Sequence, residues 1–432
     1  MLCMIFLSLL ITDCGGGGGG SSSGEGQNYN EVPTISNLQL SPSSAVLKQS
    51  NGTITVTGTI DFTDSDGDIT TLRLKVSNGT DLTSLVGGAI GETSGTVEGS
   101  FSISTESTGE YSFEVWLIDS QGNNSNKLSG TFAIKADYSG THWTKQVSGT
   151  TDQLSGITWD GNQLVVVGNN GIILTSPDGI TWTQRISGTS NDLLSIEWSG
   201  TQYIAVGEFG TILTSPDSIN WTQQNSGIAE CNLYDIKYSG SLYVAVGGEF
   251  RFPGNPNSNN TLILTSPDGQ TWTKTNSLTL TNCILHGLTW SGSEFVAVSV
   301  NELFPSDTKV LSSTDGFNWT ERTLGTLTNF SLFDIIWSGT EFVAVGTSGI
   351  VYLSPDSINW QVWDSGALNL WSVASAGNNY VTVGLAGIVA TSSDGMSWAS
   401  QPSGTGNTLG KIIWAGTQYV AVGDQGTILT SP

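Results

Sequence analysis

The chain has 432 residues, of which 37% are hydrophobic and 12% charged, so it is long enough to form several domain cores. Thirteen basic residues stand against thirty-seven acidic ones, a net charge of −24, and so acidic a surface repels nucleic-acid phosphates. We therefore expect no nucleic-acid partner. The high content of Gly and Trp, 55 and 15 residues, is typical of a turn-rich all-β protein.

The N-terminus begins with an apolar run, residues 2–11, that is too short to cross a bilayer. Cys14 and a Gly/Ser-rich stretch follow it. This order resembles the signal of bacterial lipoproteins. The resemblance implies a signal peptide over residues 1–14, a lipid on Cys14 as the only membrane attachment, and a flexible tether over residues 15–32. It places the protein at the bacterial cell envelope, with the outer membrane as the expected location. A plain signal peptide with an incidental cysteine is the alternative.

Residues 33–136 show apolar side chains at every second position, with turns of Asn, Gly and Ser between the runs. The apolar positions are Ile54, Val56, Ile60, Phe62, Leu72, Leu74, Val76, Tyr111, Phe113, Val115 and Leu117. This alternation over about a hundred residues predicts an antiparallel β-sandwich. The pattern resembles the immunoglobulin-like and cadherin-like modules of bacterial surface proteins.

Four aspartates in this region could hold a cation. Asp64, Asp66 and Asp68 alternate along one Gly-containing loop, and Asp119 begins a second Asp-Ser-Gln-Gly-Asn turn. Closely spaced carboxylates suit Ca²⁺, which prefers oxygen ligands. Asp/Gly turns also form without any metal, so a turn that binds nothing is the alternative. We expect no other cofactor.

Residues 137–432 repeat one unit seven times. A short apolar run marks each unit, and the runs begin at Val165, Ile204, Val244, Val296, Val343, Val381 and Val420. Each unit divides into four short strands separated by turns. Four-stranded units with a period near 40 residues predict the blades of a seven-bladed β-propeller.

The two ends of the repeat region predict how the ring closes. The chain stops three strands into the seventh unit, and the missing Trp-Thr strand precedes the first unit at residues 142–147. A last blade assembled from both ends leaves no open sheet edge. We therefore expect residues 142–147 to be the outer strand of blade seven.

Six units carry a Ser-x-Asp-x-x-x-Trp motif, as in Ser176, Asp178 and Trp182. It resembles the Asp-box of sialidase-type propellers. We expect the aspartate to accept backbone N–H groups in a tight turn and the tryptophan to pack between neighbouring blades. Because the motif recurs in nearly every blade, we interpret it as structural.

Cys231 and Cys283 each stand seven residues before the aromatic residue that closes a first strand, Tyr238 or Trp290. They therefore occupy equivalent positions in adjacent blades three and four. An oxidising extracytoplasmic compartment would allow a disulfide between them, provided that the Cα atoms come within about 7 Å. Two free thiols are the alternative.

Two blades depart from the regular length. Blade three has an insertion over residues 248–260 and blade four has one over residues 300–308, both between the second and third strands. In an up-and-down blade this connection lies on the face where the first strands begin, and binding residues gather in such loops. The predicted ligand-binding residues are Glu249, Phe250, Arg251, Phe252, His286, Glu302 and Phe304. Passive surface insertions are the alternative.

Over residues 142–432 the blade motif resembles the bacterial branch of the photosystem II assembly and stability factor family. That resemblance implies the propeller fold and a non-enzymatic protein that binds other proteins, and we do not extend it to a photosynthetic role. We predict a monomeric envelope-anchored lipoprotein that binds or scaffolds a protein or a glycan through its propeller loops.

A glycan-processing hydrolase is the alternative function, because Asp-box propellers include such enzymes. Asp235, Asp334 and Glu197 are the spare carboxylates near the starts of blades. Hydrolysis would need two of them about 5–10 Å apart across a cleft.

Overall fold

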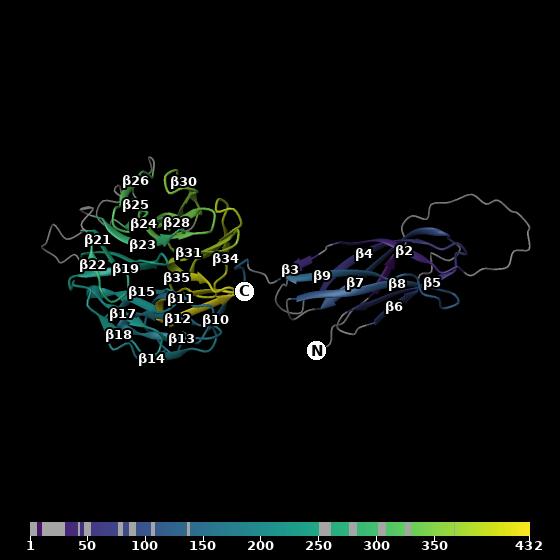
Figure 1. Cartoon of the computed structure of the whole chain (residues 1–432), viewed down its shortest axis with the longest axis horizontal. Helices are drawn as coiled ribbons and strands as arrows, with labels where there is room; N and C mark the ends of the chain where they lie inside the picture. The colour runs from purple at the N-terminus through teal and green to yellow at the C-terminus, as the bar shows by residue number, and fades with distance from the viewer. Residues whose placement is uncertain are drawn as a thin grey trace, which may run out of the picture. The chain divides into compact units, whose positions relative to one another are not determined.

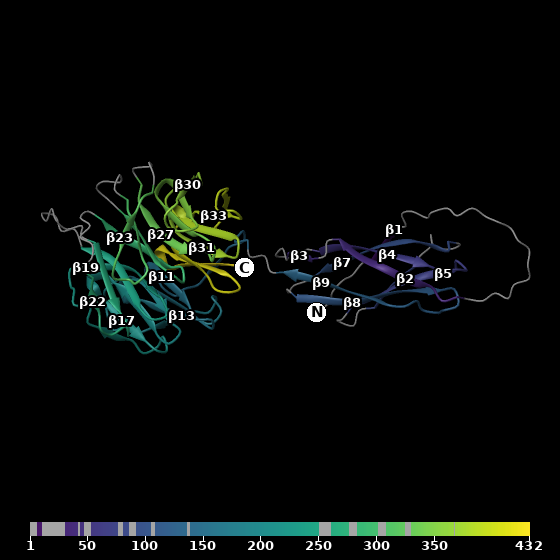
Figure 2. The same ribbon diagram turned by 45° about the horizontal axis from the view of Figure 1, so that its top comes forward.

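The computed structural model describes residues 7–10, 31–41, 44–46, 53–76, 81–85, 92–104, 109–135, 139–249, 261–275, 283–300, 308–324, 330–366 and 368–432. The chain divides into two compact units, Met1–Asp137 and Tyr138–Pro432. Both are built from β-strands, and the described part of the chain contains no helix long and apolar enough to cross a bilayer (Figure 2). The predicted all-β fold class is confirmed.

The first unit contains two sheets that share one apolar core. One sheet has the order β1 (Leu7–Leu10), β7 (Ser94–Ser104), β4 (Thr53–Thr63), β2 (Thr34–Ser41). The other has the order β3 (Ser44–Val46), β9 (Leu128–Lys135), β8 (Gly109–Asp119), β5 (Ile69–Val76), β6 (Asp81–Leu85). Every second residue of β4, β5 and β8 enters the core, as the alternation predicts. The unit is a β-sandwich.

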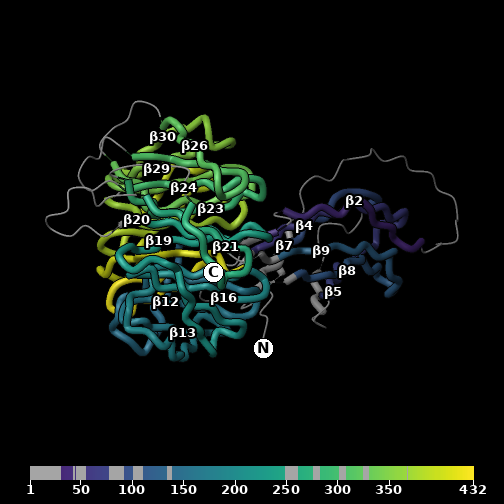
Figure 3. The backbone as a smooth tube through the Cα atoms, turned by 60° about the vertical axis from the view of Figure 1, so that its left-hand side comes forward, coloured from purple at the N-terminus to yellow at the C-terminus, as the bar shows by residue number. Residues whose placement is uncertain are grey.

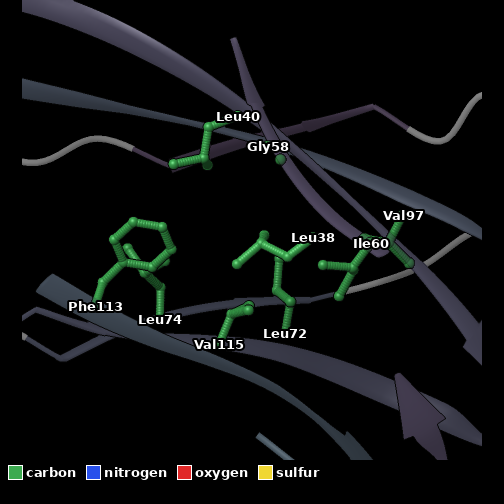
Figure 4. A pocket seen from close by; sticks show the side chains of 10 residues that line it. Leu38, Leu40, Gly58, Ile60, Leu72, Leu74, Val97, Phe113 and Val115 are labelled. Atoms are coloured by element: carbon green, nitrogen blue, oxygen red, sulfur yellow. The ribbon is translucent and has the colours of Figure 1, made fainter. Parts of the chain in front are cut away.

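The core of the sandwich contains a small apolar cavity of about 30 Å³ (Figure 4). Leucines of β2 and β5, together with Phe113 and Val115 of β8, surround it. Gly58 of β4 lies opposite Gly99 of β7, so neither strand fills the space there. A cavity with an apolar lining gives a water no hydrogen-bond partner, so we interpret it as loose packing and not as a binding site.

Strand β1 lies within the apolar run that the sequence assigns to a signal peptide. It pairs antiparallel with β7, Leu7 opposite Phe101 and Leu10 opposite Glu98. Residues 7–10 therefore cover the outer edge of β7.

The second unit contains seven four-stranded antiparallel sheets. Blades one to three are β11 (Leu154–Trp159), β12 (Leu164–Gly168), β13 (Ile173–Ser176), β14 (Thr183–Arg185); β15 (Leu193–Trp198), β16 (Tyr203–Gly207), β17 (Ile212–Ser215), β18 (Thr222–Gln224); and β19 (Cys231–Tyr238), β20 (Tyr243–Glu249), β21 (Thr261–Ser266), β22 (Thr273–Lys274). Blades four to six are β23 (Ile284–Trp290), β24 (Phe295–Val300), β25 (Val310–Ser313), β26 (Thr320–Arg322); β27 (Leu332–Trp337), β28 (Phe342–Gly346), β29 (Ile350–Ser354), β30 (Gln361–Asp364); and β31 (Leu370–Ala376), β32 (Asn379–Gly384), β33 (Val389–Ser392), β34 (Ala399–Gln401). Blade seven is β35 (Leu409–Trp414), β36 (Tyr419–Gly423), β37 (Thr427–Ser431) and β10 (Thr144–Gln146).

The first strands of successive blades contact one another, and β11 of blade one also contacts β35 of blade seven. Figure 1 shows these first strands nearest the centre, with the other strands of each blade outside them. Strand β10 pairs with β37, Thr144 opposite Thr430, and the yellow C-terminal strands lie beside blue N-terminal ones in Figure 3. The predicted split blade is confirmed, and the ring is closed.

Seven apolar clusters hold the ring together, one between each pair of neighbouring blades. The second strand of each blade contributes side chains to the clusters on both of its sides. In β12, Leu164 and Val166 face blade seven, whereas Val165 and Val167 face blade two. This is why the second strands are mostly apolar. Each cluster also contains the tryptophan of one blade's turn motif or, between blades six and seven, Trp143.

The Ser-x-Asp turns have the predicted geometry. The Asp178 carboxylate accepts the backbone N–H groups of Ile180 and Thr181 at 2.8 Å, and the Trp182 indole donates to the Gly179 carbonyl at 3.0 Å. These backbone hydrogen bonds lower the pKa of Asp178 to about 2. The same bonds recur in the other five turns, at Asp217, Asp268, Asp315, Asp356 and Asp394.

Candidate binding face of the propeller

Every first strand of the propeller carries a β-bulge at the same position. In blade three, Leu233 pairs with Gly247 and Asp235 with Val246, so Tyr234 is an extra residue. The other six blades show the same shift of register. A bulge interrupts the alternation of side chains and redirects them. In each first strand, two consecutive residues, the extra one and the next, therefore depart from the regular alternation of side chains.

The extra residues of blades three to six form an arc of aromatic rings, which we call the aromatic arc: Tyr234, His286, Phe333 and Trp371. Tyr234 stacks on His286 with ring centroids 5.1 Å apart, and Phe333 stacks on Trp371 at 4.2 Å. His286 meets Phe333 edge-on at 5.7 Å, which joins the two pairs. All four residues are partly exposed. The arc is therefore a continuous aromatic surface contributed by four blades.

The residues that follow the extra ones form an ionic network. Asp235 accepts the Ser195 hydroxyl of blade two at 2.7 Å and the Leu288 N–H of blade four at 2.9 Å. Lys411 of blade seven donates to Asp334 of blade five at 2.8 Å, which spans blade six. Such contacts between blades are possible only near the axis. Both aspartates are 2% exposed, so these two carboxylates are buried beside the arc.

Two lysines, Lys237 and Lys411, offset part of the charge of the carboxylates in this network. Burial opposes ionisation of Asp235, but Lys237, Lys411 and the Ser195 hydroxyl outweigh it and lower the pKa of that carboxyl. Lys237 also donates to Glu197 at 2.9 Å. Burial lowers the pKa of His286, so its imidazole is neutral at neutral pH and donates from Nδ1 to the Phe333 carbonyl at 2.7 Å. The arc is thus an uncharged aromatic surface beside an ionic network of three carboxylates and two lysines.

The rim of the same face is acidic beside the arc. The connection between β16 and β17 carries Glu208, whose pKa is raised by burial and by Asp192. Asp192 and Asp152 precede the first strands of blades two and one, and both bind Asn170. Phe209, 47% exposed, lies next to Glu208, and its N–H donates to Asn232 of blade three.

The predicted ligand-binding residues are only partly described. His286 lies in the aromatic arc, and Glu249 ends β20 on the face where β19 and β23 begin. Phe250, Arg251, Phe252, Glu302 and Phe304 lie outside the described residues, as does Cys14. The connections from β20 to β21 and from β24 to β25 leave the blades on the same face as the arc, because neighbouring strands are antiparallel.

The predicted disulfide is not formed. Cys231 and Cys283 are buried thiols, and neither is part of a disulfide. Cys231 packs between blades two and three, whereas Cys283 packs between blades three and four. The sheet of blade three thus lies between them, and stacked sheets are about 10 Å apart, too far for a disulfide. The two cysteines do occupy equivalent positions, but equivalent positions pack into successive interfaces between blades and do not face each other.

The four predicted calcium ligands of the sandwich are not all in one place. Asp64, Asp66 and Asp68 lie together, with ligand atoms within 4.8 Å of one another. Asp119 is outside this group. Its carboxylate accepts the N–H groups of Gln121 and Asn123 and the Asn123 side-chain amide, which fixes its own turn.

The carboxylates considered for hydrolysis have structural partners. Asp235 and Asp334 are bound by serine hydroxyls and backbone N–H groups, and Glu197 is bound by Lys237. A glycosidase needs one carboxylic acid with a raised pKa. Burial raises the pKa of Glu197, which is held by Lys237, whereas the pKa of Asp235 is lowered.

Sequence reasoning missed Tyr234, Phe333, Trp371 and Lys411. Aligning the first strands on their closing aromatic residue could have found them, because the arc stands four positions before Tyr238, Trp290 and Trp337 in blades three to five. The bulge itself has no sequence signature here, so their shared orientation was not predictable.

No family model and no curated protein matches the sequence. Solved propellers match the structure. YCF48 from Cyanidioschyzon merolae has 17% identity and a TM-score of 0.52, over 67% of this chain and 98% of its own. A structure of YCF48 bound to a D1 peptide has 19% identity and a TM-score of 0.53, over 68% and 96%. The WD40 propeller domain of Doa1 has 10% identity and a TM-score of 0.51, over 67% and 97%.

These similarities define the class of protein: the second unit is a β-propeller. YCF48 is among its structural neighbours, in agreement with the fold that the blade motif implied. At these identities the similarity concerns the fold.

Proposed function

We propose that the protein is a non-enzymatic binding or scaffolding protein whose propeller holds an extended segment of a partner protein across the aromatic arc. The observation that carries the proposal is the arc itself, four partly exposed rings in contact on four successive blades. Rigid aromatic side chains are the residues that most often dominate a protein interface. They lie on bulged strands of a closed ring, so little ordering is needed before a partner binds.

The charge of the surroundings specifies the chemistry of the partner. Asp152, Asp192 and Glu208 border the arc on blades one and two, and the chain carries a net charge of −24. A segment with apolar side chains flanked by Lys or Arg fits this face. YCF48 bound to a D1 peptide shows that a propeller of similar fold can hold a peptide, and this supports the proposal by analogy.

The rest of the proposal concerns placement. A lipid on Cys14 would hold the protein at the cell envelope, the sandwich would act as a spacer, and the insertions of blades three and four would extend the binding face. These points rest on the sequence.

The test is a peptide array, screened with the purified full chain and followed by affinity measurements on the peptides recovered. Trp371→Ala and Phe333→Ala should each weaken binding by about 1–3 kcal/mol if they are hot spots. Phe317→Ala is the matched control, because Phe317 is 46% exposed on a turn at the opposite end of the blades. Affinity should also fall as salt rises, because exposed charges are screened.

Replacing residues 250–260 by a short turn tests the insertion separately. The pairing of Gly248 with Thr261 keeps the register of β20 and β21, so the fold should survive. If the Trp371 and Phe317 variants bind equally well, the arc is not the site. Recovery of glycans and no peptides by a parallel glycan array would contradict a protein partner, and turnover of those glycans would favour the hydrolase.

A further inference from the structure

Three carboxylates of the sandwich meet where the chain crosses from one sheet to the other. Asp64, Asp66 and Asp68 occupy the connection between the last residue of β4, Thr63, and the first of β5, Ile69. Their ligand atoms lie within 4.8 Å of one another. Asp64 is buried, with 2% of its surface exposed, whereas Asp66 is exposed.

The carboxylates of Asp64 and Asp68 each accept a hydrogen bond with one oxygen only. Asp64 accepts the backbone N–H of Asp68 with Oδ2 at 2.9 Å, and Asp68 accepts the Ser120 hydroxyl with Oδ2 at 2.5 Å. In both residues the other oxygen, Oδ1, is buried and has no hydrogen-bond partner in the described part of the chain. A buried polar atom without a partner is costly, so such atoms in a folded protein call for an explanation.

Among the described residues, no cation balances this charge. None of the ion pairs between described residues involves the three aspartates. The group therefore has more negative charge and more free oxygen atoms than its surroundings satisfy.

We infer that Asp64, Asp66 and Asp68 form a Ca²⁺ site that ties the two sheets of the sandwich together. The ligands are all oxygen atoms, whereas Zn²⁺ prefers nitrogen and sulfur ligands. The exposed side, at Asp66, leaves room for the water molecules that complete Ca²⁺ coordination, and Ca²⁺ tolerates the irregular geometry of a loop better than Mg²⁺ does. The inference is independent of the proposed function of the propeller.

The orphan oxygens separate this site from an ordinary Asp/Gly turn. The Ser-x-Asp turns of the propeller also contain aspartates, but each of their carboxylates accepts hydrogen bonds with both oxygens or lies in solvent. Asp119 likewise accepts hydrogen bonds from its own turn with both oxygens. At Asp64 and Asp68, one oxygen of each carboxylate remains available inside the group.

The experiment is calorimetric titration of the EDTA-treated full chain with CaCl₂ near neutral pH. We expect one ion per chain, with a dissociation constant on the order of 10⁻⁴–10⁻³ M or tighter. Asp64→Asn and Asp68→Asn should each weaken binding at least about tenfold, since each removes a charged ligand. Glu114→Gln is the matched control: it also removes one negative charge from the sandwich, but Glu114 is exposed and paired with Lys127.

A second variant guards against misfolding. Asp64 is buried and its substitution could disturb the loop, whereas Asp66 is exposed, so Asp66→Asn should fold normally and still bind Ca²⁺ more weakly. Ca²⁺ should also raise the melting temperature of the sandwich transition and leave the propeller transition unchanged. Absence of binding at millimolar CaCl₂, equal binding by wild type and the Asp66 variant, or equal affinity for Mg²⁺ would each overturn the assignment.

Discussion

A single glycine position shows how closely neighbouring segments of a blade approach. The second strands of six blades carry a glycine at the equivalent position, at or near the strand end, and a Cβ built there would lie 1.9–2.1 Å from a backbone carbonyl oxygen at or just before the start of the first strand. For Gly207 that atom is the Asp192 oxygen, at 2.0 Å. The close approach, and not an unusual φ angle, therefore explains the recurrent glycine.

Gly207→Ala should lower the free energy of unfolding by about 1–3 kcal/mol, because backbone must move to admit the methyl group. Gly406→Ala is the control, since a Cβ there meets nothing within 4 Å. Urea unfolding followed by tryptophan fluorescence measures both, because all but one of the 15 tryptophans lie in the propeller. Equal stability of the two variants would mean that the strand end relaxes freely.

His286 should make propeller stability depend on pH. Burial lowers its pKa, Lys411 adds to this, and Asp334 and Asp235 act in the opposite direction. Because the folded form binds the proton less readily than the unfolded form, its stability contribution is complete above about pH 6.5 and is lost as pH falls.

His286→Phe should remove this loss, since blade five already carries Phe333 at the equivalent place. The measurement is urea unfolding of both proteins at about pH 7.5 and about pH 5. The turn aspartates do not interfere, because their pKa values are lowered from an already acidic range. An identical pH dependence in wild type and variant would show that the imidazole titrates normally.

At the scale of elements, the sequence predicted what is local and periodic. The strand order within a blade and the pairing of residues 142–147 with the C-terminus follow from the repeat. The bulge in each first strand does not, because it depends on how seven strands converge on an axis. For that reason the sequence places Asp235 and Asp334 near the starts of blades but does not predict their burial in a network with Lys411.

Strand β10 should control cooperativity. Trp143 packs into the cluster between blades six and seven, and Gln146 donates to the Thr430 hydroxyl at 2.8 Å. Deleting residues 137–147 should leave β37 as an open edge, with a less cooperative transition or dimers formed by edge pairing. Trp143→Ala should be milder, roughly 1–3 kcal/mol. Calorimetry and light scattering are the measurements, and an unchanged monomeric melt of the deletion protein would contradict the role of β10.

At the scale of the whole molecule, the sequence predicts attachment by a lipid on Cys14. Cys14→Ser should move the protein from the membrane fraction to the soluble fraction, because a serine cannot carry the thioether-linked lipid. Fractionation of cells that express either form is the measurement, with immunoblotting as the readout. A wild-type protein that is already soluble after cell breakage would mean that the N-terminal run is an ordinary signal peptide.

The closure of the ring also has a mechanical side. Strand β10, the outer strand of blade seven, comes before all other propeller strands in the chain. Tension between the N-terminal unit and a partner held by the blades therefore enters the ring through β10. Its ladder to β37 joins only three residue pairs, beginning with Thr144 and Thr430. We expect β10 to detach at lower force than any complete blade, as a small reversible step in a single-molecule pulling experiment. The ring would then open under force at one place: detachment of β10 would weaken the contacts of blade seven while the other six blades remain folded.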